Sequence, residues 1–462
     1  MESPSGYLET DVDVRGVVKT GRSTTMTFAY DHVYQDDVPR WDQVAQRGYS
    51  RYAFDPQLRS LLSAQWQVFP EAGPVARVDT TVSWHRTRER RERQTRGSSV
   101  LITEQDIVGT LGASLDVELR RVASWTFSAG LEAYREGIGS WRRDENQSSG
   151  LVSEKRGLYP DGASASSFAG FVNASWSLRR LQLDLGGRYS SYGVSASDAT
   201  FGELDLSPSA LVGSVAARYE LSPGLELVGS VAQSFRAPNV DDVSTLGAFD
   251  FGIEVPSPGL SPERGLGFEA GVRARAGGAG VSVIAFQTNL RDLIERVPSS
   301  FGGSETMDGQ RVYQKTNVAR AFVRGTELEA EVRISASLRA AAHVSYAYGH
   351  QPSVDQPMRR IPPLNGMASL RWSGLHGTWV EGRLRAAGAQ RRLAPGDVAD
   401  HRIPAGGKPG WQVFDIYAGH AFGPRFSVTL GLVNLLDEAY RVHGSGIDGY
   451  GRSGWVATRV GF

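Results

Sequence analysis

The chain of 462 residues contains no cysteine, so disulfide bonds and thiolate metal sites are excluded. It also lacks any run of about eighteen apolar residues, the length that a membrane-spanning helix needs. Its formal charges balance, with 50 acidic and 50 basic residues, whereas a generic nucleic-acid-binding protein carries a basic excess. We therefore expect neither a nucleic-acid partner nor a helical membrane span.

The usual sequence signals of catalysis are also missing. The chain has no G-x-S-x-G turn, no H-E-x-x-H zinc helix and no Walker loop. Acidic neighbours such as Asp241 and Asp242 are merely adjacent in the chain, which does not define a general acid and base. We expect a non-catalytic protein with no resident metal ion and no cofactor.

The N-terminus does not have the form of a secretory signal. Met1 to Gly6 shows no basic region followed by an apolar core, and the pattern is typical of a strand from Tyr7 onward. We interpret the chain as beginning part-way through a longer protein.

What the chain has instead is apolar alternation with a period of two, the signature of strands. Leu181, Leu183 and Leu185 alternate with polar neighbours, and residues 327–334 alternate Leu, Ala, Val and Ile with three glutamates and an arginine. The charged faces must reach water while the apolar faces are buried. A barrel with lipid outside and a wet lumen inside satisfies both requirements.

The connections between these strands alternate in length. Short turns are expected at 19–22, 178–180, 221–224, 276–279, 335–337, 373–377 and 422–425. Long polar loops are expected at about 35–55, 86–99, 135–166, 235–260, 297–313, 350–363, 390–409 and 437–451. Short turns on one rim and long loops on the other indicate an all-β, up-and-down antiparallel transmembrane β-barrel. About 19 strands fit the chain, and we place its short-turn rim in the periplasm, with Phe462 as a terminal aromatic anchor at the membrane interface.

Several motifs carry a family resemblance over essentially the whole chain. The sequence SFRAPN at 234–239 is followed by PGLSPE at 258–263, and further matches are NVARA at 317–321, GTELE at 325–329, IPP at 361–363 and NLLDEAY at 434–440. In this order they resemble the barrel of a TonB-dependent outer-membrane receptor. The motif DVPRWD at 37–42 resembles a loop of the haem, haemoglobin and transferrin receptor branch, although residues 239–258 hold no histidine, which that branch is expected to carry.

The resemblance implies TonB-coupled uptake of an iron compound across the bacterial outer membrane, with a ferric siderophore, haem or an iron-carrying protein as ligand. It also implies a barrel of 22 strands and an N-terminal plug, which residues 1–462 do not show. We therefore expect residues 1–462 to be the barrel domain alone: a fragment, a truncated gene product, or one part of an assembly whose other chain supplies the rest. A passive porin-like channel and an outer-membrane adhesin are the alternatives.

The candidate ligand-binding residues lie in the long loops. Around the SFRAPN motif they are Arg236, Asn239, Asp241, Asp242 and Asp250. The three aspartates, with Glu254, make this an acidic loop able to attract a cationic or iron-bearing ligand. A solvated loop, with the motif ending a strand, is the simpler interpretation.

Histidines and arginines supply the remaining candidates. Imidazole is a good ligand for haem iron, which singles out His350, His401 and His443. The arginine-rich run 86–96 is a candidate for lipopolysaccharide phosphates, although its interleaved glutamates favour pairing within the run.

Overall fold

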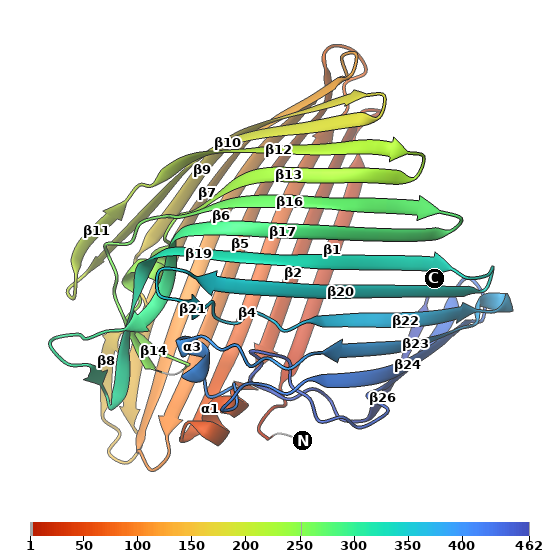
Figure 1. The fold of residues 1–462 in the computed structure, drawn as a ribbon. Helices are drawn as coiled ribbons and strands as arrows, with labels where there is room; N and C mark the ends of the chain where they lie inside the picture. Colours follow the sequence, from red (N-terminus) through yellow and green to blue (C-terminus); the bar gives the residue numbers. More distant parts are fainter. Residues whose placement is uncertain (1–2, 251, 462) are drawn as a thin grey trace.

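The computed structural model describes residues 3–250 and 252–461. Within these residues, nineteen strands run between the two rims of one curved sheet (Figure 1). They are β1 (Leu8–Lys19), β2 (Thr24–Asp36), β4 (Tyr49–Val68), β5 (Val75–Thr95), β6 (Val100–Leu119), β7 (Trp125–Asn146), β9 (Ser164–Leu178), β10 (Leu181–Asp198), β12 (Ser209–Ser222), β13 (Leu225–Arg236), β16 (Glu263–Ala276), β17 (Ala279–Pro298), β19 (Gln310–Arg333), β20 (Leu338–Gln351), β22 (Asn365–Ser373), β23 (Trp379–Ala387), β24 (Trp411–Ala421), β25 (Phe426–Val433) and β26 (Ser453–Val460).

Each of these strands pairs antiparallel with the next one in the chain, from β1–β2 to β25–β26. The meander confirms the up-and-down topology that the alternating turns indicate. Within the described residues no ladder joins β1 to β26, and both of these strands are exposed along their length. Because nineteen strands alternate in direction, β1 and β26 run the same way.

Shorter elements occupy the long connections. The short strands are β3 (Val38–Pro39), β8 (Val152–Arg156), β11 (Gly202–Leu206), β14 (Gly247–Phe249), β15 (Gly252–Val255), β18 (Thr306–Met307) and β21 (Gln356–Pro357). The helices are α1 (Trp41–Gln46), α2 (Val240–Ser244), α3 (Pro395–Val398) and the 3-10 turn η1 (Leu375–Gly377). None of the described helices has the length and apolar character needed to cross a membrane.

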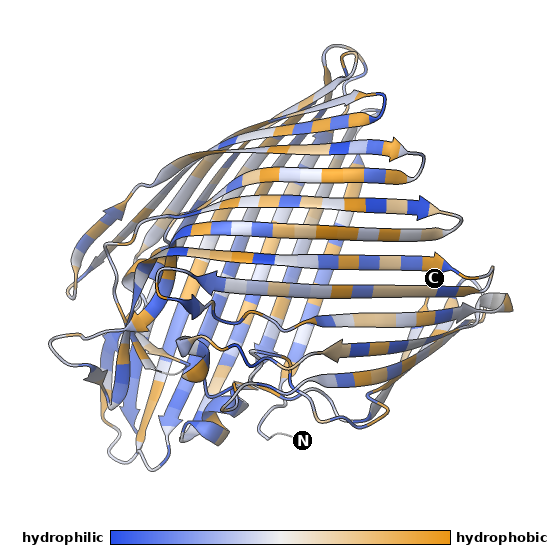
Figure 2. Ribbon diagram, in the orientation of Figure 1, coloured by the Kyte–Doolittle hydropathy of each residue, from blue (hydrophilic) through white to orange (hydrophobic). Residues whose placement is uncertain are grey.

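Cross-strand register shows which side chains share a face, because directly opposite residues point the same way. Val283 lies opposite Leu328, and Leu328 lies opposite Val344, so this apolar row continues across three strands. Figure 2 shows the resulting alternation of apolar and polar residues along the strands. We call the apolar side the outward face and the opposite side the lumen face.

The connection between β13 and β16 folds into the lumen. Arg91 on the lumen face of β5 donates to the carbonyl oxygen of Ala248 in β14, at 3.1 Å. Val240 and Val243 of α2 are buried in one apolar cluster with Val194 and Ala196 of β10. The hydrophobic core of this thin-walled protein is therefore built where a long loop packs against the inside of the wall.

Two loop predictions are wrong in extent. Residues 86–99 are not a loop, because β5 continues to Thr95 and β6 begins at Val100 after a tight turn with Gly97 at φ +80°. Likewise β7 extends to Asn146, well into the predicted loop 135–166. Charged side chains on both faces mark strands that continue beyond the membrane, where both faces meet water. The long connection between β10 and β12, which contains β11, was not predicted from the sequence.

Candidate functional site

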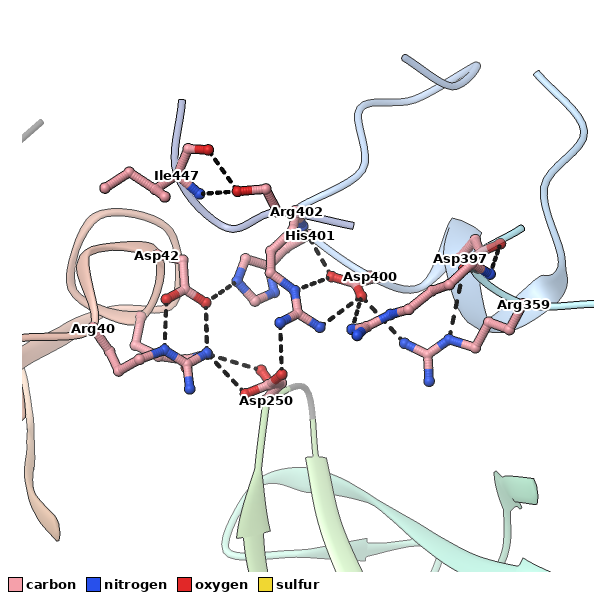
Figure 3. Close-up of polar contacts among 12 residues, drawn as sticks. Arg40, Asp42, Asp250, Arg359, Asp397, Asp400, His401, Arg402 and Ile447 are labelled. Atoms are coloured by element: carbon pink, nitrogen blue, oxygen red, sulfur yellow. Dashed lines mark hydrogen bonds and ion pairs between the residues drawn. The ribbon is translucent and has the colours of Figure 1, made fainter. Parts of the chain in front are cut away.

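The long-loop rim carries a cluster of charged residues drawn from four connections (Figure 3). We call it the rim cluster, and its members are Arg40, Asp42, Asp250, Arg359, Arg360, Asp397, Asp400, His401 and Arg402. They come from the β2–β4, β13–β16, β20–β22 and β23–β24 connections. Its four arginines balance its four aspartates in formal charge.

Asp250, at the tip of the β14–β15 hairpin, sits between two arginines. Its carboxylate oxygens lie 2.8 Å from Arg40 Nη2 and 2.8 Å from Arg402 Nη1. The hairpin that enters the lumen is thereby fixed at its tip to two other loops. Figure 3 shows both guanidinium groups pointing at Asp250.

Two further carboxylates complete the network. Asp42 accepts a bidentate pair of hydrogen bonds from Arg40, both at 2.9 Å, and lies 3.1 Å from His401 Nε2. Asp400 has a side chain with 0% exposure and contacts three arginines: Arg402 at 2.8 Å, Arg359 at 3.2 Å and Arg360 at 3.1 Å. Buried carboxylates of this kind persist only when they are paired and hydrogen-bonded.

The partners outweigh the cost of burial at both carboxylates. Burial alone raises the pKa of Asp42, but hydrogen bonds from His401 and Arg40 bring that pKa well below its usual value. Burial likewise opposes ionisation of Asp400, and its pKa is nevertheless lowered by Arg402 and Arg360. The ionised forms therefore stabilise the closed arrangement of the loops.

We expect the rim cluster to loosen in acid. Folding lowers the pKa of these carboxyl groups below about 3.9, the pKa of an aspartate in the unfolded chain. Their ionised forms therefore stabilise the folded protein fully above that pH. This stabilisation is lost as the pH falls toward the lower pKa of the folded protein. Protease cleavage at residues 396–407 should stay slow from neutral pH to about pH 4 and accelerate below it. Cleavage that is equally slow at pH 2.5 and pH 7 would contradict this assignment.

A second charged group, the lumen cluster, holds α2 and β15 against the wall. Lys315 of β19 lies 2.5 Å from Asp241, 3.2 Å from Asp242 and 3.2 Å from Glu254. Glu254 is 1% exposed and also accepts from Arg296 Nε at 2.7 Å. One lysine thus links carboxylates from two elements of the same loop.

Sequence candidates at the start of this loop have structural partners. Asn239 is the N-cap of α2: its side chain accepts from the Asp242 backbone N–H at 2.8 Å, and Asp242 accepts from the Asn239 backbone N–H at 3.2 Å. This reciprocal pair is a capping box. Arg236 bridges Asp242 at 2.6 Å and Glu263 at 2.5 Å, so the two sequence motifs are joined across the base of the loop.

The remaining histidine candidates lie apart. His350 is opposite Phe322 on the outward face, with Arg392 Nη2 at 3.1 Å from its Nδ1. The ring nitrogens of His443 are both buried and make no hydrogen bond to a described residue, and burial lowers its pKa. The structure therefore brings Asp250 and His401 together, and Asp241 and Asp242 together, but not all eight candidates. Their contact with a ligand remains a prediction.

Sequence reasoning missed the roles of Arg40, Asp42, Arg402 and Lys315. Arg40 and Asp42 belong to the motif DVPRWD, which the sequence singled out without indicating which residues they contact. Lys315 lies on a polar stretch of β19, and no neighbouring residue in the sequence indicates that it forms ion pairs. Among the described residues, no group of three or more His, Asp or Glu side chains has the geometry to hold a metal ion.

Comparison with known proteins identifies related sequences and folds. A family model described as "TonB dependent receptor-like, beta-barrel" matches residues 4–435. A probable haemoglobin and haemoglobin-haptoglobin-binding protein of Haemophilus influenzae is 28% identical over 152 residues, which is 30% of this chain and only 15% of that relative.

Solved structures share the fold at low identity. The copper transporter OprC superposes with a TM-score of 0.85 at 16% identity, covering 99% of this chain and 72% of the other. The ferric yersiniabactin uptake receptor FyuA from Yersinia pestis gives a TM-score of 0.70 at 14% identity, with 99% and 71% covered. A ferric enterobactin receptor structure, PfeA, gives a TM-score of 0.76 at 14% identity, with 99% and 72% covered.

Proposed function

Because the chain belongs to the TonB dependent receptor-like β-barrel family, whose members are found in the bacterial outer membrane, we propose that it serves uptake of an iron compound. The ligand classes are those the sequence predicts: a ferric siderophore, haem or an iron-carrying protein. The match over residues 4–435 carries this proposal, and the names of the relatives support it. The family is one of receptors and transporters, so the proposal includes no enzymatic activity.

The long-loop rim is the proposed extracellular side, and the rim cluster is the proposed capture site. Arg40, Arg359, Arg360 and Arg402 gather there from three connections. Guanidinium groups recognise carboxylate and phenolate oxygens of an anionic chelate through paired hydrogen bonds. An anionic ligand that binds Arg40 and Arg402 in place of Asp250 would free the tip of the β14–β15 hairpin.

Energy coupling forms a separate part of the proposal. We place it in a plug domain acting with the TonB complex, with residues 1–462 as the barrel domain of the receptor. Sequencing the genomic DNA upstream of the Met1 codon tests this arrangement. An in-frame signal peptide and plug would support it, and an in-frame stop codon without them would favour a passive porin-like channel or an adhesin.

Removing the β14–β15 hairpin should weaken ligand capture. Replacing residues 247–255 with a short glycine linker in the full-length protein removes Asp250 and opens the rim cluster. The probes are haemin and a ferric catecholate chelate. For whichever of them the unchanged protein binds, we expect the affinity of the variant to fall at least about tenfold, or about 1.4 kcal/mol.

The control replaces nine residues, 300–308, in the exposed connection between β17 and β19, which makes no backbone hydrogen bond to a described residue of the rim cluster. Both variants should retain the heat-modifiable mobility of a folded barrel. An unchanged affinity in a folded hairpin variant would move the capture site elsewhere.

A further inference from the structure

Three arginines stand in one row across three neighbouring strands. Arg264 of β16 lies directly opposite Arg291 of β17, and Arg291 lies directly opposite Arg320 of β19. Directly opposite residues share a face and lie close together, so the register places three like charges side by side. All three side chains are exposed.

The row lies on the outward face. Below Arg264 in the same alternation come Leu266, Phe268 and Val272, with exposures of 37%, 41% and 41%. Below Arg291 come Asn289 and Gln287 and then Val283 and Val281, and below Arg320 come Phe322, Arg324 and Thr326 and then Leu328 and Val332. The arginines therefore stand above the apolar stripe of the wall that faces lipid, separated from it on β17 and β19 by a short polar band.

The height of the row matches a membrane surface. Arg291 follows twelve residues after Ala279, where β17 begins at the short-turn rim. At about 3.4 Å per residue and a tilt of about 40°, this spans about 30 Å, compared with an apolar band of about 25 Å. Phe235 lies directly opposite Arg264, and Phe322 lies two residues along β19 from Arg320, as expected of the aromatic girdle at the interface.

The row lacks an acidic counterpart. Arg264, Arg291 and Arg320 form no side-chain hydrogen bond or ion pair with any described residue. In contrast, Arg91 and Arg93 in the arginine-rich run both pair with Glu104, at 2.6 and 3.2 Å. Like charges directly opposite one another destabilise a sheet, so a bound anion would offset the repulsion among these three arginines.

A groove runs beside the row. It has a volume of about 550 Å³, and its lining includes Arg264, Arg291 and Asn289 together with Phe235 and Leu266. The lining therefore combines cationic and polar groups with apolar ones. This combination suits a molecule with an anionic head and an acyl chain.

We propose that Arg264, Arg291 and Arg320 bind the phosphate groups of a phosphorylated lipid in the outer leaflet. Its acyl chains lie along the apolar stripe beneath, and guanidinium groups match the phosphate oxygens through paired hydrogen bonds. The sequence prediction for residues 86–96 stays a separate candidate, in which Arg91 and Arg93 are paired with Glu104 of the neighbouring strand. The site faces away from the lumen and is independent of the uptake proposal.

The test compares two triple variants of the folded protein in detergent. One carries Arg264→Gln, Arg291→Gln and Arg320→Gln. The control carries Arg273→Gln, Arg275→Gln and Arg333→Gln, which removes the same charge from the lumen face near the short-turn rim. Diphosphoryl lipid A is the probe, with its dephosphorylated form and inorganic phosphate as competitors, and bound lipid is counted by native mass spectrometry.

We expect the control to bind diphosphoryl lipid A as the unchanged protein does, and the row variant to bind it at least about tenfold more weakly. Inorganic phosphate in place of the lipid should raise the unfolding temperature only slightly, and dephosphorylated lipid A should not compete. Without lipid, the row variant should be no less heat-stable than the unchanged protein, because its substitutions remove repulsion. Equal lipid binding by the row variant, or equal binding of the dephosphorylated lipid, would overturn the proposal.

Discussion

Replacing Lys315 with methionine should release α2 and β15 from the lumen wall. Lys315 has 9% of its side chain exposed and is shared by Asp241, Asp242 and Glu254. Methionine fills much of the same volume but leaves three carboxylates without their common cation. Removing one partner from a buried charge pair typically costs about 3–5 kcal/mol, so the loop should open at least a hundredfold more often.

Hydrogen exchange at residues 240–257 measures this opening directly, because local unfolding exposes those amides without unfolding the sheet. The control is Lys155→Met, which breaks an ion pair with Asp144 at a lysine that is 50% exposed and should change protection by no more than about 1 kcal/mol. Adding Glu254→Gln to Lys315→Met should restore part of the protection. Amides in 240–257 that stay as protected as before would show that apolar packing of α2 alone holds the loop.

Substitution of Asp400 by asparagine should disrupt the rim cluster to a similar degree. Asparagine keeps the shape of the side chain but removes the negative charge that Arg359, Arg360 and Arg402 share. Three guanidinium groups then face one another around a neutral amide, in a position with 0% exposure. We expect a local loss of about 3–5 kcal/mol, seen as fast protease cleavage between residues 396 and 407 at neutral pH.

Glu145→Gln is the matched control, since its partner Arg143 is 3.4 Å away and both side chains are more than 40% exposed. This variant should be cleaved as slowly as the unchanged protein. If Asp400→Asn is also cleaved slowly while the barrel remains folded, the rim loops are held by backbone hydrogen bonds and not by charge.

The sheet was predictable because its rules are local. Period-two alternation and glycine-containing turns such as Gly277–Gly278 fixed the strand pattern, and about 19 strands were expected where nineteen are found. The loop boundaries failed where strands continue beyond lipid. There, alternation of apolar and polar residues gives way to charge on both faces, as in residues 86–96, and a strand looks like a loop.

The site was less predictable because its partners are far apart in the chain. Sequence analysis singled out Asp250 and His401 for their chemistry, but Arg40 and Asp42, which hold them, come from a loop some two hundred residues before Asp250. Lys315 lies in a strand, where no nearby residue indicates that its side chain is buried. Only the curvature of the sheet brings these groups together.

The long sequence separations in the rim cluster also set an order of events during folding. Asp42 and His401 are 359 positions apart, and Arg40 and Asp250 are 210 apart. Closing such long loops costs entropy before any contact is gained, so these ion pairs form only after the intervening strands have paired. Until then the carboxylates and guanidinium groups stay hydrated. The contact between Asp42 and His401 can therefore form only after the strands between them in the sequence have paired.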